Sequence, residues 1–219
     1  MPGTKPAAKP PVAKPPANKT RADRSAARRE AILEAALDEF AARGFAAARL
    51  DDVARRAGVA KGTIYLHFRD KQELFEELVR TMLVPHIAAL EMLATAEGSP
   101  RALGEFVLNH FVRDVLGTRV ADVIRLVIQE GSRFPEIADF YFREVVQRAI
   151  VALSRLLRRG QENGELVHES LLQFPHLVIA PFLMGLVWGS MFDRFDPLDA
   201  AGLMRAHFDI LFPPQRGSR

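Results

Sequence analysis

The chain contains no cysteine among its 219 residues. This absence excludes disulfide bonds, thiol nucleophiles and thiolate metal sites, and it suits a reducing compartment such as the cytoplasm. The six histidines are scattered, and the sequence has no HExxH pattern, no nucleophile elbow and no glycine-rich phosphate loop. We therefore expect a protein that is not an enzyme and that has no metal site and no cofactor.

Lysine is absent after Lys71, and charge is unevenly distributed along the chain. Through residue 80 there are 16 basic against 11 acidic side chains, a net charge of +5, whereas the remainder has 14 against 16, a net charge of −2. A basic N-terminal third beside a nearly neutral remainder indicates that one part meets a polyanion. Nucleic acid is the leading candidate, and an anionic membrane surface is the alternative.

Residues 1–20 differ in composition from everything that follows. The segment MPGTKPAAKPPVAKPPANKT holds six of the fourteen prolines and four lysines, and it has no apolar stretch typical of a signal peptide. Such a segment cannot bury a core, so we expect a disordered basic arm. The arm is either a solubilising tail or an additional non-specific contact to DNA.

Strand alternation is absent, and helical periodicity covers the rest of the chain. The sequence predicts an all-α fold of about nine helices, with glycines and prolines at most of their boundaries. The expected helices are residues 21–44, 50–57, 61–67, 70–94, 101–116, 119–132, 135–161, 169–192 and 197–211. The predicted division is an arm (1–20), a small helical domain (21–69) and a larger helical domain (70–219), with helix 70–94 linking the two.

The stretch AGVAKGTIYLHF (57–68) follows Ala54, and it places Gly58 four residues and Ile64 ten residues after that alanine. This spacing is typical of a helix-turn-helix, where a small residue lets two helices cross, glycine takes a left-handed turn and an aliphatic residue seals the second helix. Many helical hairpins share the spacing, so the interpretation also depends on the polar string that follows. The residues predicted to point outward are Lys61, Thr63, Tyr65 and His67.

A lysine at the start of a helix is unfavourable by a few tenths to about 1 kcal/mol, because the helix dipole is already positive there. A phosphate at the same place reverses that sign, since the lysine, the free N–H groups and the dipole all favour an anion. Lys71 repeats the arrangement at the start of the next helix. We therefore predict that Lys61 and Lys71 contact phosphates.

The segment from Arg28 to Leu78, above all LDDVARRAGVAKGTIYLHFRDKQELF, resembles the DNA-binding domain of the TetR/AcrR family of transcriptional repressors. The resemblance implies that residues 21–69 bind DNA and that residues 70–219 dimerise and bind an effector. At the positions of Ala48 and Arg49 the family often has a pair of threonine or serine residues, whose hydroxyl groups cap the following helix and contact phosphate. In this sequence the hydroxyl groups are absent, and the charge of Arg49 takes the place of the phosphate contact. The DNA-binding residues that the resemblance implies are Arg49, Lys61, Gly62, Thr63, Tyr65, His67 and Lys71.

Residues 171–192 contain no formally charged side chain. The length permits a membrane span, but Pro175 and Pro181 interrupt it, and a helix that is apolar all round is equally suited to burial in protein. We expect it to form the core of a homodimer, together with the last helix and with no membrane contact. The predicted interface residues are Gly185, Gly189, Phe192 and Phe208.

The effector pocket is predicted from apolar residues with a few polar groups among them, as in most ligand cavities. VIRLVIQEGSRFPEIADFYFREVV (123–146) is similar to effector domains of the AcrR/AefR-like branch. Arg125 needs a partner, which is either Glu130, another carboxylate or an anionic effector. The same residue types are also typical of an ordinary helical core. The predicted pocket residues are Phe106, His110, Phe111, Arg125, Ile128, Gln129, Phe140, Phe142, Met184 and Trp188.

Together these patterns predict a cytoplasmic, homodimeric, ligand-responsive regulator that binds a near-palindromic double-stranded DNA operator. The favoured form is a repressor released from DNA by a small apolar or amphipathic effector. A non-specific basic DNA-binding or membrane-surface protein is the alternative, and an activator would use the same DNA-binding unit. A C-terminal domain that binds another protein instead of a small molecule is a third reading.

Overall fold

The computed structural model describes residues 21–165 and 168–213, and within these ranges the chain is helical without a β-strand. This confirms the all-α prediction. The predicted arm, residues 1–20, lies outside the described residues. Residues 100–115 and residues 135–162 each form one continuous helical run, so the described part has eleven helices rather than nine.

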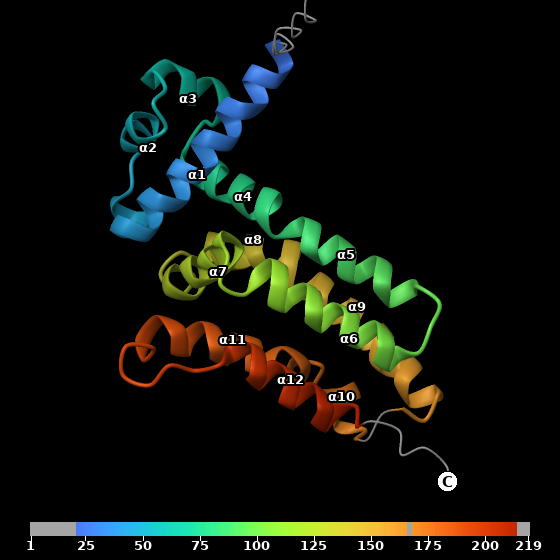
Figure 1. Cartoon of the computed structure of the whole chain (residues 1–219). Helices are drawn as coiled ribbons and strands as arrows, with labels where there is room; N and C mark the ends of the chain where they lie inside the picture. The colour runs from blue at the N-terminus through green and yellow to red at the C-terminus, as the bar shows by residue number, and fades with distance from the viewer. Residues whose placement is uncertain (1–20, 166–167, 214–219) are drawn as a thin grey trace, which may run out of the picture.

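The N-terminal unit consists of α1 (Arg21–Ala47), α2 (Leu50–Arg56) and α3 (Lys61–His67), followed by α4 (Lys71–Met82). Figure 1 shows α2 and α3 beside α1 at one end of the molecule, with α4 leading away from them. Phe40, Ile64 and Phe75 are buried where α1, α3 and α4 meet. A compact core of aromatic and aliphatic side chains therefore fixes how α3 is presented.

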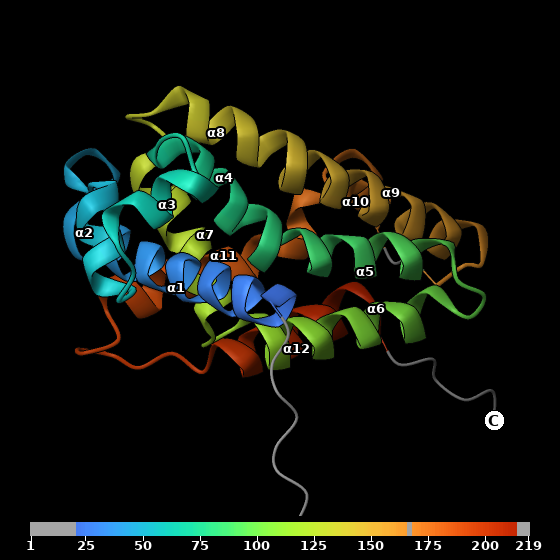
Figure 2. The same ribbon diagram turned by 90° about the horizontal axis from the view of Figure 1, so that it is seen from above.

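The larger C-terminal domain packs helices in nearly parallel layers (Figures 1 and 2). The helix α5 lies against α9, and α11 pairs with α12 at the outer edge of the molecule. The elements of this domain are α5 (Val84–Thr95), α6 (Pro100–His110), η1 (Phe111–Val115), α7 (Arg119–Glu130), α8 (Pro135–Tyr141), η2 (Phe142–Val146), α9 (Gln147–Glu162), α10 (Ser170–Gln173), α11 (His176–Met191) and α12 (Ala200–Leu211).

The two additional helices arise because two of the predicted helices contain a proline near which the structure has a break. The predicted helix 70–94 is broken at Leu83, and α4 and α5 differ in direction by 40°. Pro85 lies in the first turn of α5, where its missing N–H costs nothing, whereas inside a longer helix its ring would clash with the preceding turn. Pro175 separates α10 from α11 in the same way.

No single helix in the described ranges is both long enough and apolar enough to cross a bilayer, and α11 has only 16 residues. The bent pair α4 and α5 reaches the required length and composition only when the two helices are counted together.

The N-terminal unit meets the C-terminal domain at a bend near the end of α1. Gly44 has φ 72° and ψ 164°, a conformation that favours glycine, so regular helix ends there, as the sequence predicted. The next N–H, of Phe45, donates a hydrogen bond of 3.2 Å to Oε1 of Glu130, a buried carboxylate at the end of α7. A Cβ at position 44 would lie 2.6 Å from that oxygen. This contact and the aromatic packing of Phe45 on Phe134 hold the end of α1 to the C-terminal domain.

Candidate nucleic-acid interface and ligand pocket

The turn between α2 and α3 has the geometry of a helix-turn-helix. Gly58 takes φ 66°, and Ala54 and Ile64 are 2% and 0% exposed, respectively. The glycine, the small residue and the aliphatic residue therefore have the structural roles predicted from their spacing. The helix α3 begins at Lys61 and ends at His67, at the predicted boundaries.

One face of α3 is buried and the other is open. Ile64 and, just beyond the helix, Phe68 point into the core. On the open side, Lys61, Gly62 and Tyr65 are exposed, whereas Thr63 and His67 are half-buried. The structure thus brings five of the seven predicted DNA-binding residues together on one short helix.

Lys61 has a partner inside the chain that the sequence argument missed. Its Nζ lies 2.7 Å from Oδ2 of Asp51 in the first turn of α2, and the hydroxyl of Tyr65 donates to the other oxygen of Asp51 at 3.3 Å. The hydrogen bond from Lys61 lowers the pKa of Asp51, and the same bond raises the pKa of Lys61. No external phosphate is needed to explain this lysine, and Asp51 instead holds the two outward side chains in place.

Gly62 has no internal reason to be glycine. A Cβ at this position would meet no atom of the described residues within 4 Å, although glycine in a helix is less stable than alanine by roughly 0.5–1 kcal/mol. The missing side chain leaves the backbone of α3 open to close approach from outside the protein. This favours the predicted contact at Gly62.

Lys71 also has a structural role that the sequence did not reveal. Its Nζ donates to the carbonyl oxygens of Phe45 and Ala46, both at 2.8 Å, and lies 4.7 Å from the centre of the Phe45 ring. The lysine therefore caps the last turn of α1, where a positive charge is favourable. Its contact with phosphate stays a prediction, as does that of Arg49, which is exposed and begins α2 without a side-chain cap.

Leu66 is a candidate that the sequence interpretation omitted. Its side chain is 85% exposed on α3, four residues after Gly62. The sequence could have predicted this, because a helix whose residues 64 and 68 face inward has residue 66 on its outer side. An exposed aliphatic group on such a helix suits contact with a thymine methyl group.

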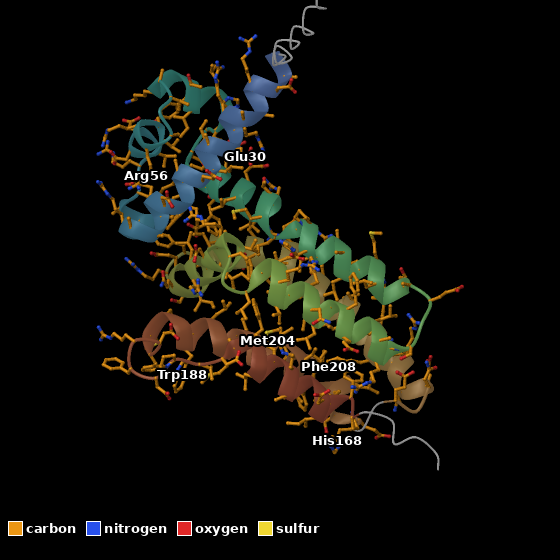
Figure 3. The ribbon with its side chains drawn as sticks, viewed as in Figure 1. Glu30, Arg56, His168, Trp188, Met204 and Phe208 are labelled. Atoms are coloured by element: carbon orange, nitrogen blue, oxygen red, sulfur yellow. The ribbon has the colours of Figure 1, made fainter. Side chains whose placement is uncertain are left out.

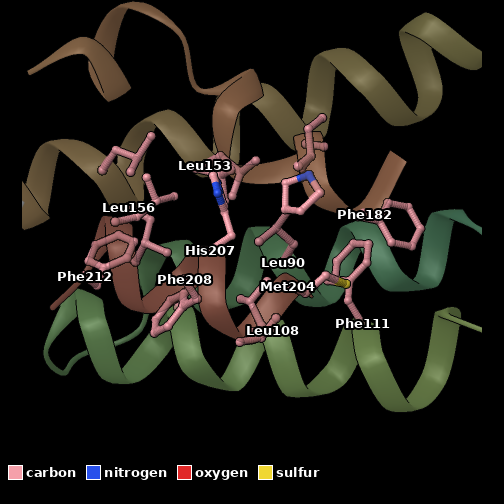
Figure 4. A pocket seen from close by; sticks show the side chains of 18 residues that line it. Leu90, Leu108, Phe111, Leu153, Leu156, Phe182, Met204, His207, Phe208 and Phe212 are labelled. Carbon is pink, nitrogen blue, oxygen red and sulfur yellow. The ribbon is translucent and has the colours of Figure 1, made fainter. Parts of the chain in front are cut away.

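A cavity of about 80 Å³ lies inside the C-terminal domain, and the open space at its mouth brings the total empty volume to about 780 Å³. Its walls come from α5, α6, η1, α9, α11 and α12, and Figure 4 shows the lining side chains. Of the 18 lining residues, His207 alone has a polar side chain. Gly104 lets Phe208 approach α6, because a Cβ at this glycine would lie 2.9 Å from the Phe208 ring. An apolar lining with one polar side chain is typical of a small-molecule site.

Of the predicted pocket residues, Phe111 lines this cavity and the others do not. Phe106, Phe142 and Met184 are 59%, 53% and 46% exposed on outer faces of their helices, and Gln129 is exposed as well. Trp188 donates its indole N–H to the carbonyl of Asp196 near the end of α11 (Figure 3). Helical periodicity does not show which of these residues face inward, because aromatic and methionine residues occur on both faces of these helices.

Two of the three polar pocket candidates, Arg125 and His110, have partners within the C-terminal domain. Arg125 pairs with Asp122 at 2.7 Å, so its carboxylate partner among the described residues is a neighbour in α7 rather than Glu130. His110 lies between Asp114, at 2.7 Å, and His86, at 3.0 Å. Burial and the neighbouring His110 lower the pKa of His86. Both candidates therefore stabilise contacts within the C-terminal domain.

The predicted dimer-interface residues divide into two pairs. Gly185 is buried, and a Cβ there would lie 2.8 Å from the Cβ of Ala200, so this glycine lets α11 and α12 of one protomer pack closely. Phe208 lines the cavity instead (Figures 3 and 4). Gly189 faces open space, and Phe192 is 40% exposed. The latter two belong to an exposed apolar surface over α11, α12 and their neighbouring loops, which also includes Phe174, Leu177, Leu183, Met184, Met191, Phe195 and Ile210.

A helix-turn-helix unit with an open second helix, joined to a helical domain with an apolar cavity, defines a class of DNA-binding regulators. Residues 32–78 match the family described as "Bacterial regulatory proteins, tetR family", and residues 102–206 match "AefR-like transcriptional repressor, C-terminal domain". The chain belongs to the TetR family of bacterial regulatory proteins.

Individual relatives agree with this assignment. The chain is 32% identical over 141 residues to the HTH-type transcriptional regulator TtgR of Pseudomonas putida, a match that covers 57% of this chain and 63% of TtgR. Native NalD, the secondary repressor of the MexAB-OprM multidrug efflux pump in Pseudomonas aeruginosa, is 26% identical with a TM-score of 0.65, covering 86% of this chain and 98% of NalD. The complex of SmeT with triclosan has the same fold, with a TM-score of 0.70 at 21% identity, over 86% of this chain and 93% of SmeT.

Proposed function

We propose that this chain is a cytoplasmic, homodimeric transcriptional repressor that binds specific DNA through α3 and leaves it when a small apolar molecule occupies the cavity. The observation that carries the proposal is the open face of α3, where Lys61, Gly62 and Tyr65 are exposed while Ile64 seals the helix to its core. The relatives TtgR and NalD, named as a transcriptional regulator and a repressor, support the same function.

On DNA, each protomer inserts α3 into the major groove with its first residues towards the base edges. Lys61 leaves its carboxylate partner Asp51 and binds a phosphate or a guanine instead. The hydroxyl of Tyr65 turns towards the phosphate backbone of the DNA. Two protomers then read two half-sites about one helical turn, or a multiple of it, apart. The operator is accordingly near-palindromic.

The dimer forms through the apolar surface over α11 and α12. Exposed aromatic and aliphatic side chains gather there, and Gly189 leaves room for close approach of a second helix. A contiguous apolar surface of this kind is rare on a monomer and typical of an interface. The helices α11 and α12 of the two protomers form a four-helix contact.

The cavity communicates with α1 through contiguous packing. Phe111 lines the cavity and begins η1, which leads into α7. At its start α7 holds α1 through the pair Arg119–Asp38, and at its end through the hydrogen bond from Phe45 to Glu130. A ligand that displaces Phe111 therefore shifts η1 and α7, and with them α1, on which the position of α3 depends. A coupling of about 1–3 kcal/mol lowers operator affinity about 5- to 150-fold.

The salt dependence of DNA binding separates this function from non-specific binding through the basic arm. If the dimer neutralises about eight phosphates, log K falls against log[salt] with a slope near −7. We expect the full chain and a chain lacking residues 1–20 to prefer the operator over random DNA by the same factor, measured by fluorescence anisotropy. Loss of all DNA binding on removal of residues 1–20 would support the non-specific alternative.

A further inference from the structure

The cavity wall contains a hydrogen-bond acceptor with a fixed orientation. His207 of α12 is the one polar side chain among the 18 lining residues, and its Nε2 lies 2.8 Å from the carbonyl oxygen of Leu177 in α11. Figure 4 shows the imidazole among the aliphatic and aromatic side chains of the cavity. A carbonyl oxygen only accepts hydrogen bonds, so Nε2 carries the hydrogen.

The chain provides the reason why this carbonyl is available. In an α-helix the carbonyl of Leu177 would accept from the N–H of residue 181, but that residue is Pro181, which has none. His207, in the neighbouring helix α12, donates to this carbonyl in place of the missing N–H. The hydrogen bond therefore fixes the tautomer of the neutral imidazole, and it leaves Nδ1 as a lone-pair acceptor. Within the described residues Nδ1 has no hydrogen-bond partner.

The rest of the lining selects against charge. A charged group among carbon side chains loses its hydration without compensation, whereas an apolar group gains free energy there. The cation behind this wall is Arg101, whose guanidinium lies 5.5 Å from the centre of the Phe208 ring and pairs with Asp209 at 3.4 Å. One of its nitrogens, Nη1, is buried without a partner among the described residues, so an anionic ligand is the competing chemistry.

We propose that the effector is an uncharged, largely apolar molecule with one hydroxyl or N–H group, which donates a hydrogen bond to Nδ1 of His207. This inference rests on the proposed function, because it assigns the ligand class of the same cavity. An apolar body fills the volume between α6, α9 and α11, and the single donor sets the orientation of the ligand. Alkylphenols are simple compounds of this class.

Isothermal titration calorimetry of the full-length protein tests the inference with para-hexylphenol and its methyl ether, para-hexylanisole. The two compounds differ by the hydroxyl hydrogen, so we expect the phenol to bind about 2- to 13-fold more tightly, the range for one net hydrogen bond. In His207→Leu, whose side chain has no acceptor, the two affinities become equal. His168→Leu, the matched change at an exposed histidine outside the lining, keeps the difference.

Equal affinity of the wild-type protein for the phenol and the ether would overturn the inference, and this comparison does not depend on whether the His207 variant folds. Tighter binding of decanoic acid than of the phenol, abolished by Arg101→Gln, would overturn it in favour of an anionic ligand. DNA affinity is measured separately. If the phenol binds through His207 but operator affinity does not change, the ligand class stands and the proposed ligand-responsive function fails.

Discussion

Lys61→Ala weakens operator binding by about 30-fold or more while the protein stays folded and dimeric. The side chain is 67% exposed at the start of α3 and bonded to Asp51, so its loss removes no core packing. A specific contact contributes about 1–3 kcal/mol, and a dimer loses two of them, about 2–6 kcal/mol in total. If the lysine contacts phosphate, the salt slope also decreases by about one unit for each protomer.

Fluorescence anisotropy with operator DNA, at several salt concentrations, measures this effect. Arg158→Ala is the matched control, because Arg158 is an exposed basic residue on α9, far along the chain from α3, and its removal changes the net charge equally. We expect the control to bind the operator as the wild type does. Equal operator affinity of Lys61→Ala and the wild type would contradict the assignment of α3 as the DNA-reading helix.

Met184→Glu converts the dimer into monomers and abolishes operator binding. Met184 is 46% exposed in α11, within the apolar surface that we assign to the dimer. A carboxylate buried there has no partner and costs about 3 kcal/mol in each protomer, which raises the dimer dissociation constant on the order of 10⁴-fold. A single protomer reads only one half-site, so the loss of the dimer removes operator binding as well.

Analytical ultracentrifugation at micromolar concentration tests this expectation. Met92→Glu is the control, because Met92 is also an exposed methionine, 74% exposed, but lies on α5, outside the apolar surface over α11 and α12. The control is expected to remain a dimer. Should Met184→Glu sediment as a dimer and bind the operator normally, the dimer does not form through this surface.

Local sequence patterns were sufficient for the helix-turn-helix. The spacing of Ala54, Gly58 and Ile64 depends on contacts within a few turns of helix, so it predicts both the left-handed turn and the inward face of α3. The boundaries of α3 and the cap of Asp70 on the N–H of Glu73 were predictable for the same reason.

Contacts between distant segments could not be predicted. Glu130 accepts a hydrogen bond from Phe45, which lies 85 residues earlier in the sequence. Lys71, the first residue of α4, caps the end of α1. The lining of the cavity could not be predicted for the same reason, because helical periodicity shows that Met184 and Phe208 are apolar but not which one faces inward. The breaks in the helices are the exception, because Pro85 and Pro175 disfavour a continuous helix at positions that the sequence itself shows.

A footprint of the full-length protein on the DNA that flanks its own gene tests the central claim most directly. The account predicts protection of a two-fold symmetric site, with half-sites whose centres lie about 10–10.5 base pairs, or a multiple of this, apart. The protection should persist in the presence of excess random DNA. Uniform protection without a preferred site, removed by random competitor, would contradict the account.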